Sequence, residues 1–229
     1  MPRDDHEPSM PLFFLSYARA ASVLRANGPQ PDPNGYVVQF FNDLSRDVAE
    51  LAPRMPGAEP GFMDRSMQGG GRWTDELLQA VGGCQVFVAL LSAAYMRSEW
   101  CGMEWHAFSQ RTVDKVTEGA SSHQTCIIPV AWAPVLDEQV PACVLAVQRF
   151  SPTDLPEPDM AWRYETDGLF GLLRMGLDGA YRTVVWRLAM RIRDIYYKHS
   201  VEPHMFDRAE LRDIFHEQEG AQHLPGARQ

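Results

Sequence analysis

Lysine is nearly absent from this 229-residue chain, where Lys115 and Lys198 are the only two. The chain has no long basic block, and its formal net charge is −9 at pH 7. Such an acidic surface disfavours binding to nucleic acid or to anionic membranes. The start, MPRDDHEPSM, is too polar for a signal peptide, and no apolar run approaches the ~18 residues of a membrane span. We therefore expect a cytoplasmic protein that binds neither nucleic acid nor membrane.

Metal-binding and phosphate-binding motifs are also missing. The four cysteines, Cys84, Cys101, Cys126 and Cys143, form no CxxC or Cys/His pattern, so buried reduced thiols are expected and no metal site. The loop GGGRW (69–73) lacks the Lys-Ser/Thr pair of a P-loop and the GxGxxG spacing of a dinucleotide fingerprint. We expect no resident cofactor.

Short apolar runs alternate with helical patterns along the chain, and 45% of the residues are hydrophobic, enough for a substantial core. Alternating strands and helices predict an α/β fold: a flavodoxin-like doubly wound sheet of about five parallel strands with helices on both faces. Ligands of such folds bind outside the carboxyl ends of the strands. Strands are predicted at 11–17, 61–64, 84–92, 124–133 and 144–150, and helices at 36–51, 74–81, 98–112 and 181–197.

The predicted domain covers residues 11–198. Residues 1–10 are expected to be a disordered N-terminal tail. The stretch 151–180, rich in proline, glycine and acids, is predicted to be irregular. Residues 199–229 form a C-terminal extension, in which a short helix is predicted over 206–218.

One glutamate stands among large apolar residues in YMRSEWCGMEW (95–105). If Ser98 caps a helix, Trp100, Glu104 and Phe108 lie on one face at i, i+4 and i+8. Burial between aromatic rings raises the pKa of a carboxyl, and proteins tolerate this mainly where the group is paired or used. Glu104 is therefore either a functional carboxyl or the partner of an arginine, such as Arg19 or Arg111.

Three segments carry a family resemblance. FFLSYAR (13–19), GFMDRSMQGGGRW (61–73) and FVALLSAAYMRSEWCGMEW (87–105) resemble, in order and spacing, the signature boxes of the TIR (Toll/interleukin-1 receptor) domain family. The resemblance covers about residues 11–150, with Ala93 where the family usually has proline. It makes 181–197 the last helix of the domain, delayed by an insertion at about 151–180. A looser similarity links the chain to TIR-like proteins encoded beside FxSxx-type peptide-maturation systems in actinomycetes.

The resemblance implies an activity. Many bacterial, plant and axonal TIR domains cleave NAD⁺, and the glutamate of the W-C-x-x-E box, here Glu104, is their catalytic acid. The implied products are nicotinamide and ADP-ribose or a cyclic isomer. A carboxylate near the ribose would stabilise an oxocarbenium-like transition state, as in glycoside hydrolysis. NAD⁺ is then a substrate and not a cofactor.

The same resemblance implies NAD⁺-binding positions around Glu104. Tyr17 and Arg19 would face the adenosine or phosphate part, and Asp64 would lie at the rim near a ribose hydroxyl. Trp73 would close the family's BB loop, either stacking on a ring of the ligand or anchoring the following helix in the core. Trp100 is placed with these residues, although packing explains it better than ligand contact.

Two other functions stay open. A non-catalytic TIR adaptor would act by self-association, with other TIR or signalling proteins, or within a peptide-maturation complex. Glu104 favours the enzyme, whereas the bulk of Trp105 and the insertion at 151–180 leave room for a closed pocket. A flavodoxin-like FMN or nucleotide binder is disfavoured because no phosphate loop is present.

Overall fold

A parallel sheet forms the centre of the molecule. The computed structural model of the chain describes residues 10–19, 34–52, 59–64, 75–117, 125–153 and 155–216. Within these ranges four strands pair in the order β2-β1-β3-β5, and every pairing is parallel. The predicted α/β class with a flavodoxin-like parallel sheet is thereby confirmed. The strands are β1 (Phe13–Tyr17), β2 (Gly61–Met63), β3 (Val86–Leu91) and β5 (Ile127–Ala131).

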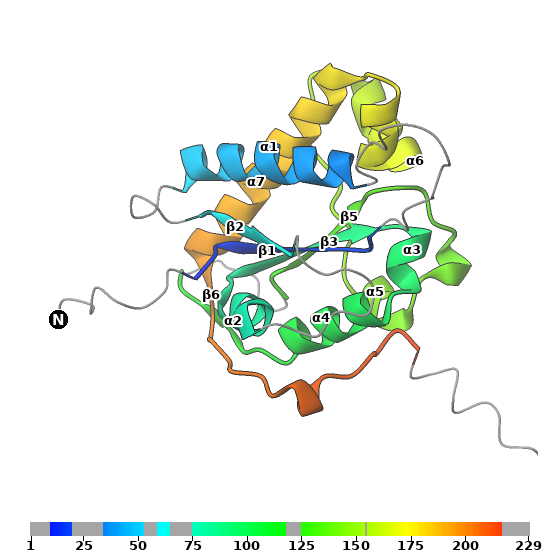
Figure 1. Cartoon of the computed structure of the whole chain (residues 1–229). Helices are drawn as coiled ribbons and strands as arrows, with labels where there is room; N and C mark the ends of the chain where they lie inside the picture. Colours follow the sequence, from blue (N-terminus) through cyan, green and yellow to red (C-terminus); the bar gives the residue numbers. More distant parts are fainter. Residues whose placement is uncertain are drawn as a thin grey trace, which may run out of the picture.

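Helices cover both faces of the sheet (Figure 1). One face carries α1, α6 and α7, and the other carries α2 and α4, with the short α3 and α5 beside α4. No helix of the described residues is both long and apolar enough to cross a membrane. The helices are α1 (Gly35–Leu51), α2 (Asp75–Gly83), α3 (Ala93–Met96), α4 (Glu99–Ser109), α5 (Ala142–Leu145), α6 (Pro158–Arg174) and α7 (Asp178–Lys198).

Apolar periodicity explains how the two long helices pack. In α7 the buried side chains include Val184, Leu188, Ile192 and Ile195, which recur every three or four residues. α1 buries a similar stripe, and the two helices pack against each other. β3 is buried at every position, as expected of a central strand with helices on both sides.

The prediction of a strand at 144–150 is wrong. The first residues of this stretch belong to α5, and the N–H of Phe150 bonds to the carbonyl of Pro129 in β5 at 2.8 Å. Pro129 has no N–H to donate to a further strand. The N–H of Ala131, two residues further along β5, donates to the hydroxyl oxygen of Tyr164 at 3.0 Å. The described sheet therefore ends at β5 and has four strands instead of about five.

The stretch predicted to be irregular, 151–180, contains α6 and the start of α7, so that prediction is also wrong. α6 is kinked at Gly168, whose φ of 66° lies in the left-handed region. A Cβ there would lie 2.5 Å from the carbonyl oxygen of Trp132, directly after β5. Glycine allows both the kink and this close approach, which the acid-rich and proline-rich composition did not reveal.

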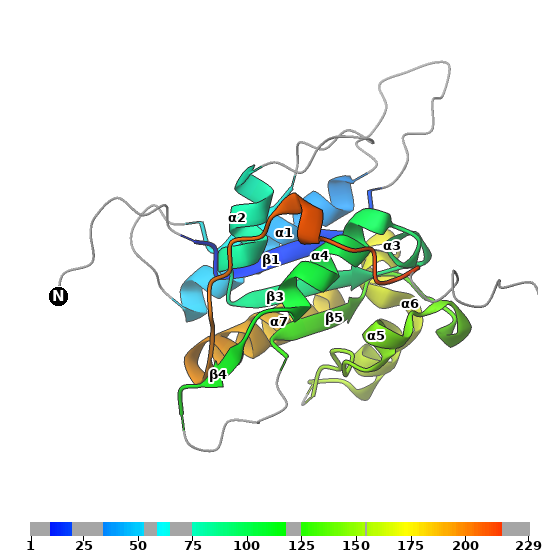
Figure 2. The same cartoon turned by 90° about the horizontal axis from the view of Figure 1, so that it is seen from below.

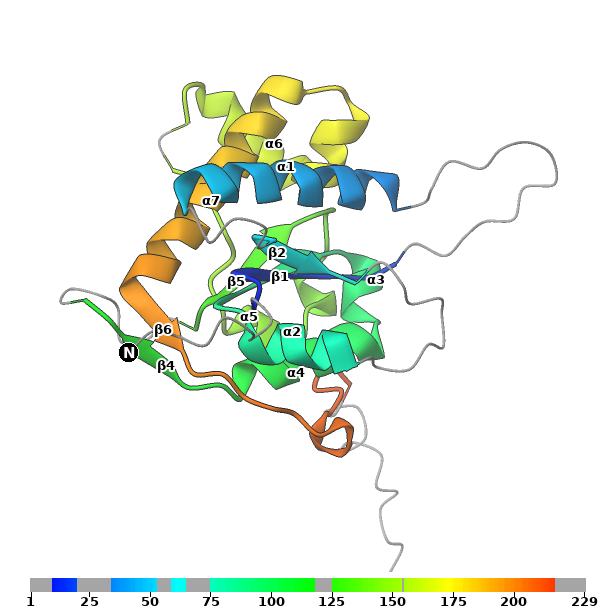
Figure 3. The same ribbon diagram turned by 60° about the vertical axis from the view of Figure 1, so that its left-hand side comes forward.

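The C-terminal extension wraps around the face that carries α2 and α4 (Figure 2). It begins with β6 (His199–Val201), which pairs antiparallel with β4 (Val113–Lys115). Residues 202–216, here called the C-terminal strap, then pass beneath α2 and α4 (Figure 3). In place of a helix over 206–218, the strap has one 3₁₀ turn, η2 (Arg208–Glu210), with a capping box; residues 217–218 lie outside the described ranges.

Arg111 ties the strap to the domain. Its side chain donates to the carbonyls of Val81 and Cys84 at 3.0 and 2.6 Å, at the end of α2. It also donates to Val201 and Glu202 at 3.3 and 3.0 Å, where the strap begins. A guanidinium suits this position because its fixed fork of donors can reach several carbonyls at once.

Candidate functional site

Glu104 lies in α4, whose start is capped as predicted. The Ser98 hydroxyl accepts the N–H of Cys101 at 3.3 Å, and the helix then continues to Ser109. Glu104 is 9% exposed, while Trp105 beside it is 2% exposed. Trp105 packs edge-on to Phe87 in the core, so its bulk does not fill the side of the helix on which Glu104 lies.

A chain of hydroxyl groups holds the Glu104 carboxyl. Ser16, at the carboxyl end of β1, donates a hydrogen bond from its Oγ to Oε2 of Glu104. The same Oγ lies 3.0 Å from the phenol oxygen of Tyr95 in α3. Since the single Ser16 proton goes to Glu104, Tyr95 donates to Ser16 in this arrangement. Ser16 is 1% exposed and Tyr95 is fully buried, so the chain Tyr95–Ser16–Glu104 runs through the interior.

Burial raises the pKa of the Glu104 carboxyl from 4.5 to about 8. The hydrogen bond from Ser16 and the guanidinium of Arg19 lower this pKa, and the carboxylate of Asp64 raises it. At pH 7 the group is therefore mostly protonated in the free protein.

The alternative of an ion pair with Glu104 is not supported within the described residues. Arg111 donates to backbone carbonyls, and the guanidinium of Arg19 contacts Asp64. Glu104 is thus a buried carboxyl with a hydroxyl partner in place of a cationic one. The Ser16 hydroxyl and the more distant Arg19 guanidinium offset the desolvation of the carboxylate only in part. A buried carboxyl whose pKa stays perturbed in this way is a candidate functional group.

Three other predicted site residues come together beside Glu104. The Tyr17 hydroxyl and the Arg19 guanidinium both donate to the backbone carbonyl of Asp64 at 2.9 Å. Arg19 also lies 3.5 Å from the Asp64 carboxylate, and the two side chains are 28% and 15% exposed. The parallel pairing of β1 and β2 brings these residues together, since both strands end at the same edge. Burial raises the pKa of the Tyr17 phenol.

The two predicted tryptophans are less informative. Trp73 lies outside the described residues, so both of its predicted roles stay predictions. Trp100 is half-buried and packs against the hydrophobic core, in keeping with a packing role. Phe108, expected on the same helix face, packs on Phe87 with ring centroids 5.3 Å apart.

Sequence reasoning missed Ser16 and Tyr95. Both lie in segments that resemble the family, FFLSYAR (13–19) and FVALLSAAYMRSEWCGMEW (87–105), and each is a polar residue within or shortly after a buried strand. The Ser92 hydroxyl caps α3 by accepting the N–H of Tyr95 at 3.1 Å, which fixes the position of the phenol. A buried hydroxyl at a strand end is a detectable signal, although its partner cannot be named from the sequence.

The described residues contain no cluster of three or more His, Cys, Asp and Glu side chains suited to a metal ion. Cys84, Cys101 and Cys126 are buried free thiols, as expected, and Cys143 is half-buried. Burial raises the pKa of the Cys101 thiol well above 9, which makes this cysteine a poor nucleophile.

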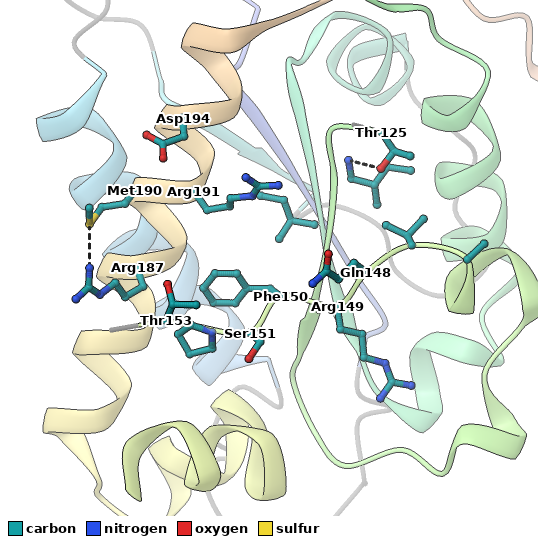
Figure 4. Close-up of a pocket in the computed structure, with 15 residues that line it drawn as sticks. Thr125, Gln148, Arg149, Phe150, Ser151, Thr153, Arg187, Met190, Arg191 and Asp194 are labelled. Atoms are coloured by element: carbon teal, nitrogen blue, oxygen red, sulfur yellow. Dashed lines mark hydrogen bonds between the residues drawn. The ribbon is translucent and has the colours of Figure 1, made fainter. Parts of the chain in front are cut away.

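A separate cavity of about 750 Å³ lies between α7 and residues 146–153 (Figure 4). Arg191 extends from α7 towards this space and Phe150 lies opposite. Arg149 instead pairs with Asp137 at 2.9 Å. The cavity is lined by residues at the start of β5, including Thr125 and Ile127, and by none of the predicted site residues.

Comparison with known proteins identifies the family. The sequence profile described as the TIR domain matches residues 43–166, more than half of the chain. The chain belongs to the TIR domain family. No curated protein and no solved structure gives a significant match. The matched region of this TIR domain includes Asp64, Trp73, Trp100 and Glu104, whereas β1 and the strap lie outside it.

Proposed function

We propose that this TIR domain cleaves the nicotinamide–ribose bond of NAD⁺, releasing nicotinamide and ADP-ribose or a cyclic isomer. The observation that carries the proposal is the buried Glu104 carboxyl, held by Ser16 at the carboxyl edge of a parallel sheet. Ligands of doubly wound folds bind at this edge. Family membership supports the proposal without deciding it, because TIR domains include both enzymes and non-catalytic adaptors.

The reaction needs one carboxylate and no general acid. When the glycosidic bond breaks, its electron pair goes to the pyridinium nitrogen, so nicotinamide leaves as a neutral molecule. Positive charge develops at C1′ of the ribose, where an ionised Glu104 stabilises it. Water then adds to C1′ and releases a proton, which gives ADP-ribose; attack by a nucleophile of the same molecule gives a cyclic product.

The raised pKa of Glu104 gives the substrate a role in activation. In the free protein the carboxyl is mostly protonated at pH 7, because its pKa is about 8. A pyridinium cation bound within a few ångströms favours the carboxylate and so lowers that pKa. Binding of NAD⁺ would therefore promote loss of the proton from Glu104, the residue that cleaves it. A neutral nucleoside has no pyridinium cation and would not have this effect.

The neighbouring residues take binding roles in this proposal. Arg19 keeps N–H groups beyond its contacts with Asp64 and is the phosphate partner, because a guanidinium can bind phosphate oxygens in pairs. The Asp64 carboxylate takes a ribose hydroxyl, and Tyr17 lines the site beside them. Trp73 follows Asp64 by nine positions in the sequence and is assigned to the nicotinamide or adenine side.

Assembly is part of the proposal. Glu104 is only 9% exposed in the single chain, so a second copy or a partner TIR domain is expected to open or complete the site. The net charge of −9 opposes association of two copies at low ionic strength.

We place this activity in a bacterial defence or signalling system of the cytoplasm, where NAD⁺ is available. The same low exposure also favours the second candidate, an adaptor without turnover.

Nicotinamide release from NAD⁺ tests the proposal, measured by chromatography on a dilution series with light scattering of the same samples. We expect specific activity to rise with protein concentration, and Glu104→Gln to abolish it. Glu99→Gln, an exposed position of the same helix, is the matched control and should keep activity. Full activity of the Glu104→Gln protein removes Glu104 from the mechanism. A stable oligomer without turnover at any concentration supports the adaptor.

A further inference from the structure

Phe215 is buried near the end of a strap that is otherwise mostly exposed. It is 8% exposed, whereas Met205 in the first part of the strap is 94% exposed. The Phe215 ring packs against Tyr95 at 5.7 Å and against Trp105 at 6.1 Å, measured between centroids. The preceding carbonyl, of Ile214, faces the thiol of Cys143 at 4.0 Å. The strap end therefore occupies a notch between α3, α4 and α5.

Helix α4 is shaped to receive this strap end. A Cβ at Gly102 would collide with Oδ1 of Asp213 and lie 3.3 Å from the Phe215 ring. The Asp213 side chain is tied to the rest of the strap end, because Oδ1 accepts the N–H of Phe215 at 3.1 Å and Oδ2 pairs with His216 at 2.5 Å. Any larger residue at Gly102 would push this group off the helix.

A separate anchor holds the beginning of the strap. The N–H of His204 donates to the Gly82 carbonyl at 3.0 Å, and Gln85 bonds both backbone groups of Val201. Arg111 adds its bonds to Val201 and Glu202. Because the stretch between the two anchors is mostly exposed, release of the far end would leave the hydrogen bonds of the near anchor intact.

Phe215 connects to Glu104 through two intervening side chains. It covers Tyr95, whose phenol bonds Ser16, and Ser16 bonds the carboxyl of Glu104. We propose that Phe215 is a positioning residue for Glu104, and that the seated strap end keeps the Tyr95–Ser16–Glu104 chain dry and fixed. Release of the strap end hydrates this chain and loosens the carboxyl. The catalytic part of this inference rests on the proposed function, while the structural link from strap to carboxyl does not.

Burial is the component of the Glu104 environment that the strap controls. Arg19 and Asp64 lie at the ends of β1 and β2, beyond the strap, and their charges stay in place when the strap end leaves. Seating the strap thus raises the pKa of Glu104, because it excludes water from the hydroxyl chain. The titratable and charged groups that face the carboxyl or its hydroxyl chain are Tyr17, Arg19, Asp64, Tyr95, Cys101 and Cys143, and Asp213 acts on Cys101.

Two substitutions should release the strap end from its notch in different ways. Phe215→Ala deletes the ring, and Gly102→Ala keeps every polar group while displacing Asp213. The pH dependence of kcat/KM for nicotinamide release should show its acidic limb about one pH unit lower in both, as expected for a partly hydrated carboxyl. The plateau rate should fall about tenfold, since positioning is lost. Phe215→Leu retains bulk and should recover most of the wild-type profile.

Phe206→Ala is the matched control, because it removes the same ring from the near anchor, beside Gly82. The kcat/KM of this variant should stay within about twofold of the wild-type value at each pH, and its acidic limb should not move, because Phe206 lies away from Tyr95. If Phe206→Ala shifts the limb as much as Phe215→Ala, the effect is general loosening and the inference is overturned.

A second measurement needs no NAD⁺. The difference in unfolding free energy between the chain with Glu104 and its Glu104→Gln form is measured from pH 5 to 9, with and without Phe215→Ala. The inference expects a smaller pH dependence of this difference when Phe215 is absent. An unchanged dependence overturns it, even if nicotinamide is released. A third outcome separates the two proposals. If the wild type releases no nicotinamide but the pH dependence of the stability difference falls when Phe215 is absent, the proposed function is overturned and the link from the strap to Glu104 is supported.

Discussion

Replacing Glu104 by Gln should stabilise the protein by an amount that grows with pH. The carboxyl has a pKa of about 8 when folded and 4.5 as its ordinary value. Above pH 4.5 the unfolded chain loses this proton while the folded chain keeps it, so wild-type stability falls as the pH rises, until about pH 8. Gln has the same shape, still accepts from Ser16 and cannot ionise, so the mutant does not share this loss.

The magnitude follows from the two pKa values. At about 1.36 kcal/mol per pH unit, the interval from 4.5 to about 8 corresponds to about 5 kcal/mol at pH 9 and about 3 kcal/mol at pH 7. For a chain of this size, about 3 kcal/mol raises Tm by roughly 6–12 °C. Below pH 4.5 the two proteins should be about equally stable.

Urea denaturation of both proteins at five pH values between about 5 and 9 provides the measurement. Taking the difference between them cancels the other titrating groups, which the two chains share. Glu99→Gln, exposed in the first turn of the same helix, should give a small difference that does not vary with pH. A wild-type chain whose stability rises relative to the Glu104→Gln form as the pH increases would falsify the reasoning.

Two further predictions concern the site and the fold. The kcat/KM for nicotinamide release should rise about tenfold per pH unit below about pH 8 and level off above it, because this ratio reports the ionisation of Glu104 in the free protein. A flat profile from about pH 6 to 9 contradicts the role of Glu104 as the catalytic carboxylate. Gly168→Ala should lower stability by about 2 kcal/mol more than Gly176→Ala in urea denaturation, since both have positive φ but only the former Cβ meets Trp132 at 2.5 Å. Equal losses would show that strain at φ, and not the contact, sets the cost.

Signals that act over a few residues are sufficient to predict most elements. The apolar run of β3, the periodicity of α7 and the Ser98 cap of α4 are present in the sequence and are confirmed. Periodicity and capping depend on neighbours one or two turns away, so local sequence contains them. The strand predicted at 144–150 is wrong because Pro129, in another segment, lacks the N–H that it would need.

The candidate site is only partly predictable. The sequence indicates Glu104 through its apolar neighbours and the family motif. It indicates Tyr17, Arg19 and Asp64 through the motif and through their position at the carboxyl ends of predicted strands. Their roles stay predictions, although the structure brings all four to one edge of the sheet. Ser16 and Tyr95 escape such reasoning because the bonds that join Ser16 to Tyr95 and to Glu104 span 79 and 88 positions.

Tertiary packing decided the chemical state of Glu104. An identical motif on an isolated helix would place the carboxyl in water, where its pKa is ordinary. Here β1 supplies Ser16, α3 supplies Tyr95, and the strap covers Tyr95 with Phe215. Desolvation depends on how completely distant segments exclude water, and no rule of local spacing encodes that. The sequence by itself determined which residue carries the carboxyl, and only the fold determined that this carboxyl holds its proton at neutral pH.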